Sequence, residues 1–342
     1  MTTISKSISI AARVVLDLHA LNNEGSESNR LLTRQVGIVT VGRNEDGEAG
    51  YQRSVVNAVS GDMLKHIFAD YFRHIALDRG LPLCDACKAL DPARMNGNPD
   101  FAEYLKSKPS PADVITRLIS CALDDVCGIL VTGEGTSVKR KSAVEFGWMI
   151  GLPGVTEVQE FIHARHAITR LTRTKATKES AKEQQEKAAQ EKAANIGQMI
   201  FNRPASSGVY AFVAHLDACA IGFNDAEQKY MIDEAQRRAR LQAALLSLAQ
   251  TLIQPKGALT STQMPHVVDM QGYVSVSSRA ATAPLSSPLR DDFVEQAHKV
   301  ADMNERLYGG GANGVLDFSG ADGLLGRMVE LADDVVPGTY RE

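Results

Sequence analysis

A run of cations with no acid among them, HAITRLTRTKATK at residues 166–178, is the stretch with the plainest chemistry in this sequence. It carries Arg170, Arg173, Lys175 and Lys178. Guanidinium and ammonium groups at this density suit phosphate oxygens, so the run predicts contact with a nucleic-acid backbone. Charge runs are also common on solvated surfaces that bind nothing, and composition alone does not separate these two interpretations.

Thiols are the second group of side chains that could do chemistry. Cys84 and Cys87 form a Cys-x-x-Cys pair in a turn-rich segment, and Cys121 and Cys127 follow later. Four thiolates can close a tetrahedral zinc site, but the spacing of the second pair is loose. We therefore expect reduced, partly buried thiols in place of a metal site, and we expect no cofactor.

Catalytic patterns are scarce. The sequence has no P-loop, GxSxG or HExxH motif and no GxGxxG between a strand and a helix, and GGGANG at 309–314 is typical of a flexible loop. Asp124 and Asp125 are adjacent and would point in different directions on a helix, so we expect solvated surface acids. The eight histidines are scattered without triad spacing. These observations argue against an enzyme.

Length and composition bound the class of protein. The chain has 342 residues, of which 44% are hydrophobic, and a formal net charge of −4, so it can bury a large core and is no uniformly basic coat for nucleic acid. Its start, MTTISKSISIAARVV, alternates polar and apolar residues, and no apolar run reaches the length of a membrane span. We expect a cytoplasmic protein, and five cysteines suit that reducing compartment.

The elements that must position these residues indicate an α+β protein. Alternation over residues 8–19 predicts a half-buried strand, and RQVGIVTVG and RSVVNAV flank a Gly-rich turn. Ser60 is the expected cap of a helix that Gly80 ends. GVYAFVAHLD predicts a strand, and residues 226–253, capped by Asn224 or Asp225, predict a long helix.

Two excursions interrupt this series. Residues 81–127 are turn-rich and then helical, and KESAKEQQEKAAQEKAAN, after the basic run, has no large apolar residue and cannot fill a core. The order fits a ferredoxin-like sheet of the RNA-recognition kind better than a doubly wound nucleotide-binding fold, because helices do not alternate regularly with strands.

Five separated stretches, in order and roughly in spacing, resemble a family of CRISPR-associated proteins. They are LDLHALNNEG, NAVSGDMLKHIFADYF, QMIFNRPASSGVYAF, RRARLQAALLSLA and PKGALTSTQMP. The family is the Cascade backbone subunits of the DevR (autoregulator) type, a branch of the repeat-associated RNA-binding superfamily. The resemblance covers the chain from about residue 8 to about residue 275.

The resemblance implies a hand-shaped protein. It implies a modified ferredoxin-like palm at 1–80, 128–160 and 207–285, a finger insertion at 81–127 and a thumb hairpin with a charged insert at 161–206, before a C-terminal helix and loop extension at 286–342. It further implies a non-catalytic subunit whose copies polymerise along CRISPR guide RNA in a type I surveillance complex for antiviral defence. The implied partners are the guide RNA, target DNA through the guide, further copies of the chain and other Cascade subunits, with no membrane.

Residue chemistry and resemblance together select the expected RNA contacts. The basic run and the returning QMIFNR form a thumb limb, the helix start VSGDMLKHIF presents free amides and Lys65, and PKGALTSTQMP offers short donors beside a glycine. Lys139 and Arg140 are further candidates. The expected RNA-binding residues are Asn22, Asn23, Lys65, His66, Lys139, Arg140, Arg165, Arg170, Arg173, Met199, Phe201, Arg203, Lys256, Gly257, Ser261, Thr262 and Gln263.

Two other functions stay open. Related backbone subunits that target RNA cut it with an acidic residue, so a metal-dependent endoribonuclease is the main alternative, with Asp17 or Asp62 as the acid to suspect. A transcriptional regulator or other oligomer-forming scaffold is the third, and it would not bind guide RNA tightly.

Overall fold

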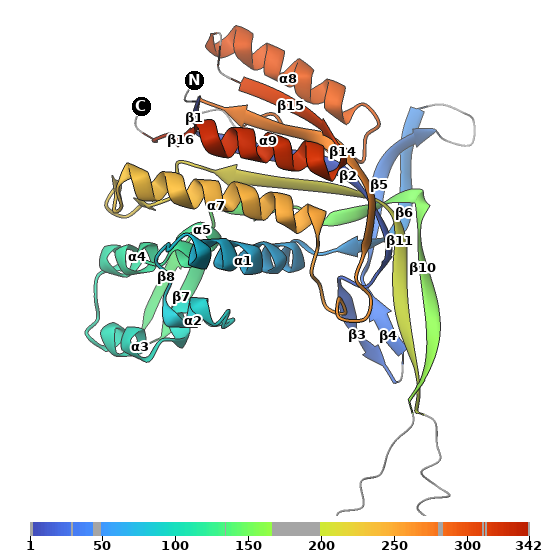
Figure 1. The fold of residues 1–342 in the computed structure, drawn as a ribbon, viewed down its shortest axis with the longest axis horizontal. Helices are drawn as coiled ribbons and strands as arrows, with labels where there is room; N and C mark the ends of the chain where they lie inside the picture. Colours follow the sequence, from blue (N-terminus) through green and yellow to red (C-terminus); the bar gives the residue numbers. More distant parts are fainter. Residues whose placement is uncertain are drawn as a thin grey trace, which may run out of the picture.

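A large antiparallel sheet with helices on both faces organises the molecule (Figure 1). The computed structural model describes residues 3–28, 30–43, 49–133, 135–165, 199–279, 283–309, 311 and 313–340. The basic run at 166–178 and the charged segment after it lie outside these residues. The expected mixture of helices and strands is confirmed.

The strands of the main sheet follow an order quite different from their order in the chain. From one edge to the other they are β15 (Asn313–Ser319), β14 (His266–Ser277), β2 (Ser7–His19), β11 (Met199–Asp217), β10 (Met149–Arg165), β6 (Ala49–Val59) and β5 (Gln35–Arg43). Neighbours on this path pair antiparallel. β9 (Val144–Phe146) also pairs with β11, and β4 (Arg30–Thr33) joins β3 (Asn23–Glu27) to it.

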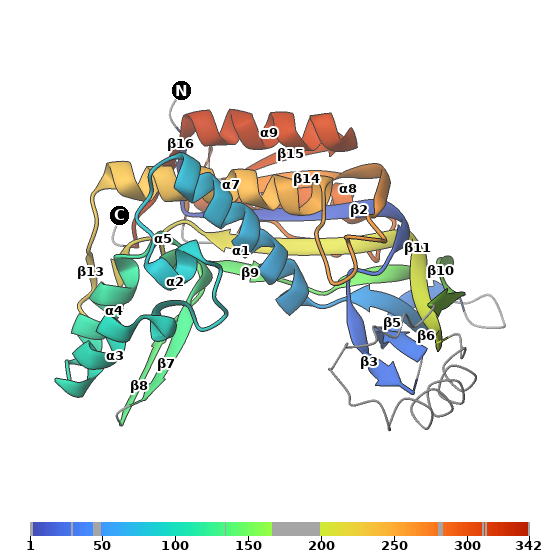
Figure 2. The same ribbon diagram turned by 60° about the horizontal axis from the view of Figure 1, so that its bottom comes forward.

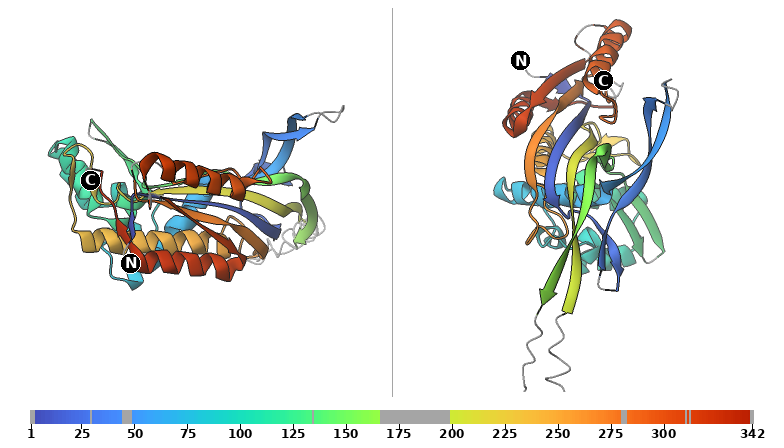
Figure 3. Two further views of the ribbon diagram at one scale, coloured as in Figure 1. Left: turned by 90° about the horizontal axis from the view of Figure 1, so that it is seen from above. Right: turned by 90° about the vertical axis from the view of Figure 1, so that its right-hand side faces the viewer.

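The β10–β11 hairpin extends well beyond the rest of the sheet (Figure 3, right). Its pairing continues out to Arg165 opposite Met199, with a shift of register between Gly151 and Thr156. Opposite that shift, Gly208 has a φ of +149°, and a Cβ there would lie 2.4 Å from the Val155 carbonyl oxygen. Only glycine tolerates this close approach, so the bulge is built into the hairpin.

Strand β2 is buried on both of its faces, where alternation predicts burial on one. Its even-numbered residues, such as Ile10, join the main core under α1 (Gly61–Asp78), α7 (Glu234–Ile253) and α9 (Gly320–Asp334). On the odd face, Ala11 packs with Phe293 of α8 (Phe293–Tyr308). The helix α8 thus covers the face that was expected to meet solvent (Figure 3, left).

The helices α1 and α7 begin at polar caps. Ser60 Oγ accepts a hydrogen bond from Met63 N at 3.2 Å, which confirms the expected start of α1. The expected start of α7 at 226 is wrong, because Asp233 is its cap and accepts from Gln236 N at 2.7 Å. Asn224 instead is buried at the end of a short strand, Phe223–Asn224, where its side chain accepts from the amides of Ala226 and Glu227 in the turn that follows.

The excursion after α1 is helical and lies at the opposite end of α1 from the β5–β6 hairpin (Figure 2). It contains α2 (Asp85–Lys88), the 3₁₀ turn η1 (Arg94–Gly97), α3 (Pro99–Lys106), α4 (Pro111–Ile119) and α5 (Ala122–Cys127), followed by the hairpin of β7 (Ile129–Gly133) and β8 (Thr136–Arg140). Smaller pairs are β1 (Thr3–Ser5) with β16 (Val335–Pro337) and β12 (Phe223–Asn224) with β13 (Lys229–Tyr230).

The expectation that Asp124 and Asp125 are surface acids is wrong, because both are fully buried. Asp125 accepts from Arg140 Nη2 at 2.5 Å and from Arg240 Nη1 at 2.7 Å, and both guanidinium groups are buried as well. The amide of Gly222 also donates to this carboxylate. A fully paired carboxylate of this kind joins α5, β8 and α7 into one unit.

Candidate nucleic-acid interface

Four distant segments meet in what we term the loop junction, consisting of Asn22, Asn23, Ser60, Arg203 and residues 256–263. Asn22 is buried, and its Oδ1 accepts from Ser60 N at 2.7 Å, so the end of β2 is tied to the start of α1. Its Nδ2 donates to Asn23 O at 3.2 Å. The asparagine therefore acts through its neighbours, because its own side chain is already paired.

Gly257 brings the loop after α7 against the chain just beyond β2. A Cβ at this position would lie 2.5 Å from Leu21 O and 2.6 Å from Leu21 Cα. Ala258 N donates to Leu21 O at 3.2 Å, and Gly257 N donates to Thr260 Oγ1 at 2.6 Å. The expected close approach at this glycine is thus made to the protein's own backbone.

The polar end of the same loop docks on β11. Arg203 Nη1 donates to Thr262 Oγ1 at 2.9 Å, and Gln263 Nε2 donates to Pro204 O at 3.0 Å. Ser261 and Thr262 are exposed. Lys256 is exposed too, and its Nζ lies 4.4 Å from the centre of the Tyr71 ring, a cation–π distance.

A second surface, which we term the cationic groove, lies between α1, the turn at 92–96 and β8. It has a volume of 580 Å³, and besides the buried Arg140 the cations that line it are Lys65, Arg94, Lys139 and Lys141. Lys139 is exposed, while Lys141 Nζ pairs with Glu145 Oε1 at 2.9 Å. The structure therefore brings the expected residues Lys65 and Lys139 to one surface, which is separate from the loop junction.

Lys65 carries its charge in an unfavourable setting. Partial burial is the largest cause and lowers the pKa of this amine; the neighbouring Arg94 also lowers it, while Cys127, Asp62 and Glu145 act in the opposite direction. A bound anion would relieve both effects by supplying a counter-charge. His66, the next residue, is exposed on α1.

Arg140 is misassigned as an RNA contact. Its side chain is buried, and its guanidinium donates to Asp125, to Ala220 O at 2.6 Å and to Phe223 O. The alternation of β8 explains the difference, since it places Lys139 outside and Arg140 inside. Arg140 therefore supports the groove from the protein interior and presents no charge to solvent.

The expected thumb contacts fall largely outside the described structure. Arg170 and Arg173 lie among the residues that are not described, and for Arg165, Met199 and Phe201 only the backbone is described, at the paired end of β10 and β11. These five residues stay predictions.

Sequence reasoning did not find two cations of the groove, Arg94 and Lys141. Arg94 Nη1 donates to Gly128 O at 2.8 Å, and the residue stands in a turn-rich stretch that carries no recognisable motif. Lys141 directly follows the Lys139–Arg140 pair, so extending that pair by one residue would have found it.

Potential metal ligands gather at one place in the described part of the chain, where Cys84, Cys87, Cys121 and Asp124 approach one another. Cys127, the expected fourth member, is not in this group; it is fully buried, which raises the pKa of its thiol to about 11. Asp17 and Asp62 are exposed and do not belong to the group either.

Comparison with known proteins finds relatives that all carry CRISPR-associated names. A sequence model of the family described as "CRISPR-associated negative auto-regulator DevR/Csa2" matches residues 10–298. A protein of Methanocaldococcus jannaschii named "CRISPR-associated protein Cas7/Cst2/DevR" is 25% identical over 315 residues, covering 87% of this chain and 89% of its own length. One of Saccharolobus solfataricus named "CRISPR-associated protein Cas7/Csa2 1" is 25% identical over 289 residues and covers 81% of each chain.

Solved structures overlap with the chain more loosely. A chain of a "CRISPR RNA-guided surveillance complex, pre-nicking" has a TM-score of 0.42 at 13% identity, over 88% of this chain and 89% of that one. Csc2 of Thermofilum pendens has a TM-score of 0.36 at 12% identity, over 94% and 80%. Within the described residues, no helix is both long and apolar enough to cross a membrane.

Proposed function

This chain belongs to the CRISPR-associated DevR/Csa2 family, and from that premise we propose that it binds CRISPR guide RNA as a non-catalytic backbone subunit of a type I surveillance (Cascade) complex. Several copies polymerise along one guide and present its bases to invading DNA, which serves antiviral defence. Its partners are the guide RNA, target DNA through the guide, further copies of the chain and other Cascade subunits.

The observation that carries this proposal is the loop junction. Asn22, Ser60, Arg203 and Thr262 are far apart in sequence, and they meet at the base of the long β10–β11 hairpin with Lys256 and Ser261 exposed beside them. Exposed short donors and a cation on a backbone fixed by internal hydrogen bonds suit phosphate and ribose, which carry no sequence information. The cationic groove adds Lys65 and Lys139.

The sheet order supports a ferredoxin-like palm. In chain order, β2, α1, β9, β11, α7 and β14 form a strand–helix–strand–strand–helix–strand series, and their strands lie in the order β14, β2, β11, β9, all antiparallel. Under this proposal residues 81–127 are the finger insertion, 161–206 the thumb and 286–342 the C-terminal extension. The palm then comprises 1–80, 128–160 and 207–285.

The test is the salt dependence of guide-RNA affinity. Lys65→Ala and Lys256→Ala should each weaken binding by on the order of 1 kcal/mol for every guide sequence, and should lower the salt slope by about one unit. Matched controls are Lys88→Ala and Lys106→Ala, because these lysines pair with Asp85 at 2.9 Å and Glu103 at 2.6 Å on their own helices. Losses confined to particular guides, or equal losses in the controls, would contradict the proposal.

The alternative, a metal-dependent endoribonuclease, makes a different prediction. Labelled target RNA mixed with the guide complex and a divalent metal should stay intact under our proposal, whereas the alternative predicts cuts at regular intervals. Under our proposal, Asp17→Ala and Asp62→Ala should also leave guide binding unchanged. Cuts that either substitution abolishes would establish the alternative in place of a non-catalytic subunit.

A further inference from the structure

Three thiols and one carboxylate converge inside the 81–127 excursion. Their ligand atoms, the Sγ atoms of Cys84, Cys87 and Cys121 and a carboxylate oxygen of Asp124, all lie within 4.8 Å of one another. Cys87 Sγ lies 3.4 Å from Asp124 Oδ2, and Cys84 Sγ lies 3.8 Å from the same oxygen. All three cysteines are free thiols. The four groups are therefore close enough to coordinate a single ion.

The distances fit a single tetrahedral ion. With Zn–S bonds of about 2.3 Å and Zn–O bonds of about 2.1 Å, tetrahedral angles separate two sulfurs by about 3.8 Å and a sulfur from an oxygen by about 3.6 Å. The two measured sulfur–oxygen distances lie on either side of that value. Three thiolates and a carboxylate select zinc over the hard, oxygen-seeking cations magnesium and calcium.

The spacing of the four residues in the sequence also supports a shared metal site. Cys84 is the N-cap of α2 with Cys87 three residues on, and Cys121 is the N-cap of α5 with Asp124 three residues on. Residues three apart across the first turn of a helix lie on one face, so each pair aims two ligands in one direction. The motif is thus Cys-x-x-Cys facing Cys-x-x-Asp, and the loose partner Cys127 is not needed.

Asp124 has a polar atom that the protein leaves unsatisfied. The residue is fully buried, and within the described structure its Oδ1 has no hydrogen-bond partner. The nearest cation, Arg94, keeps its Nη1 3.9 Å away and donates to Gly128 O instead. Asp125, by contrast, is paired with two arginines. A buried carboxylate left in this state is costly unless another charge faces it.

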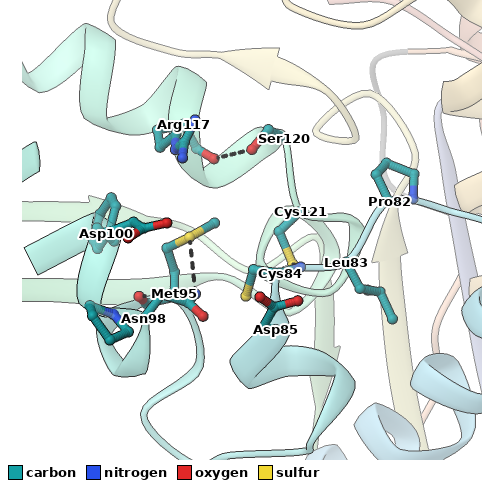
Figure 4. Close-up of a pocket in the computed structure, with 12 residues that line it drawn as sticks. Pro82, Leu83, Cys84, Asp85, Met95, Asn98, Asp100, Arg117, Ser120 and Cys121 are labelled. Atoms are coloured by element: carbon teal, nitrogen blue, oxygen red, sulfur yellow. Dashed lines mark hydrogen bonds between the residues drawn. The ribbon is translucent and has the colours of Figure 1, made fainter.

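We propose that Cys84, Cys87, Cys121 and Asp124 bind one Zn²⁺ ion in a closed structural site. Binding displaces the thiol protons to solvent and forms three Zn–S bonds and one Zn–O bond, with no change of oxidation state. Arg94 faces the surplus negative charge. A pocket of 500 Å³ lined by Cys84, Asp85, Asn98 and Cys121 gives the ion an entry path (Figure 4).

The site would fasten the start of α2 to the α4–α5 turn. These two segments are short, and a metal crosslink between them would add to the stability that their apolar side chains give as part of the main core. The inference stands apart from guide-RNA binding, since the ligands are internal and three of the four are buried.

Elemental analysis of the full chain, purified without chelator, tests the proposal. We expect about one zinc per chain. Cys84→Ser and Asp124→Asn should each lose most of that zinc on dialysis against a chelator, whereas the control Cys219→Ser should retain it, because Cys219 is buried outside the ligand group.

Cobalt substitution of the unaltered chain keeps the test independent of how variants fold. Apoprotein that takes up one Co²⁺ with thiolate-to-cobalt charge transfer and intense visible bands has a tetrahedral thiolate site. Folded protein without zinc that fails to develop these bands on adding Co²⁺ would overturn the proposal. Zinc retained equally by the wild type, Cys84→Ser and Asp124→Asn would overturn it as well.

Discussion

The loop junction and the cationic groove are two candidate RNA surfaces built on opposite principles. The loop junction is fixed by short-range contacts to backbone groups, with Gly257 close against the backbone of Leu21 and the Asn22 side chain accepting from the Ser60 amide. The cationic groove presents Lys139 and Lys141 to solvent beside the partly buried Lys65, and a buried ionic network centred on Asp125 lies behind its wall.

This difference predicts how far the effect of a substitution spreads from each surface. A substitution in the loop junction should disturb only nearby residues, because each contact there joins residues that touch one another directly. Damage to the groove should spread, because Asp125 joins the excursion to α7 through Arg240.

Asp125→Ala should have the largest effect, because it leaves Arg140 and Arg240 buried without a counter-charge. We expect a loss of about 3–5 kcal/mol in the free energy of unfolding, measured by urea denaturation. The exposed Asp85, paired with Lys88 on α2, is the control, and Asp85→Ala should cost less than about 0.5 kcal/mol. Similar costs for the two would contradict the role given to the buried ionic network of Asp125.

Acid should destabilise the chain at His19, the residue at the end of β2 beside the loop junction. Burial lowers the pKa of this imidazole from 6.5 to about 4. The unfolded chain therefore takes up the proton first, so the contribution is complete above pH 6.5 and is lost as pH falls toward 4.

Over that window the loss is about 3 kcal/mol at most. His19→Phe keeps the edge-on contact with Tyr210, whose ring centre lies 4.9 Å away, and should remove this part of the pH dependence. An unchanged slope of stability against pH in His19→Phe would show that another group is responsible.

Gly257→Ala should cost about 1–3 kcal/mol, since the added Cβ meets backbone atoms of Leu21 that cannot rotate away. Gly326→Ala is the matched control, because no atom lies within 4 Å of the added Cβ on α9. That change should stabilise by about 0.5–1 kcal/mol. Thermal unfolding of the pair gives the comparison, and equal signs would contradict it.

Thr262→Val should have the smallest effect. It removes the hydroxyl that accepts from Arg203, at an exposed position. Stability should change by less than about 0.5 kcal/mol, while guide-RNA affinity falls by roughly 2- to 10-fold through one lost polar contact. Filter binding measures the second effect, and Ser261→Ala provides a neighbouring comparison. Unchanged affinity in both would exclude this end of the loop from the interface.

Sequence patterns predicted elements whose signals are local. The alternation of β2 and the Ser60 cap of α1 were found because each depends on a few adjacent residues. The predicted cap of α7 is wrong because Asn224 and Asp233 are equally good caps by type, and only the burial of Asn224 at the end of β12 separates them.

The errors at the candidate sites have a different origin. Asp124, Asp125 and Arg140 read as surface charges because charged residues usually are, and their buried partners come from distant segments. The loop junction was predicted only as separate pieces, since no pattern within PKGALTSTQMP states that it meets Leu21. Pairings across long stretches of chain leave no local signature.

The ion pair between Asp125 and Arg240 also limits when the 81–127 segment can complete its folding during translation. The two residues are 115 positions apart, so at about 5–20 residues per second the ribosome needs roughly 6–23 seconds to add the arginine after the aspartate. During that interval the emerging 81–127 segment cannot bury Asp125 with both of its partners. A nascent chain stalled before α7 should therefore expose this segment to protease, and fragments that end before Arg240 should not fold it.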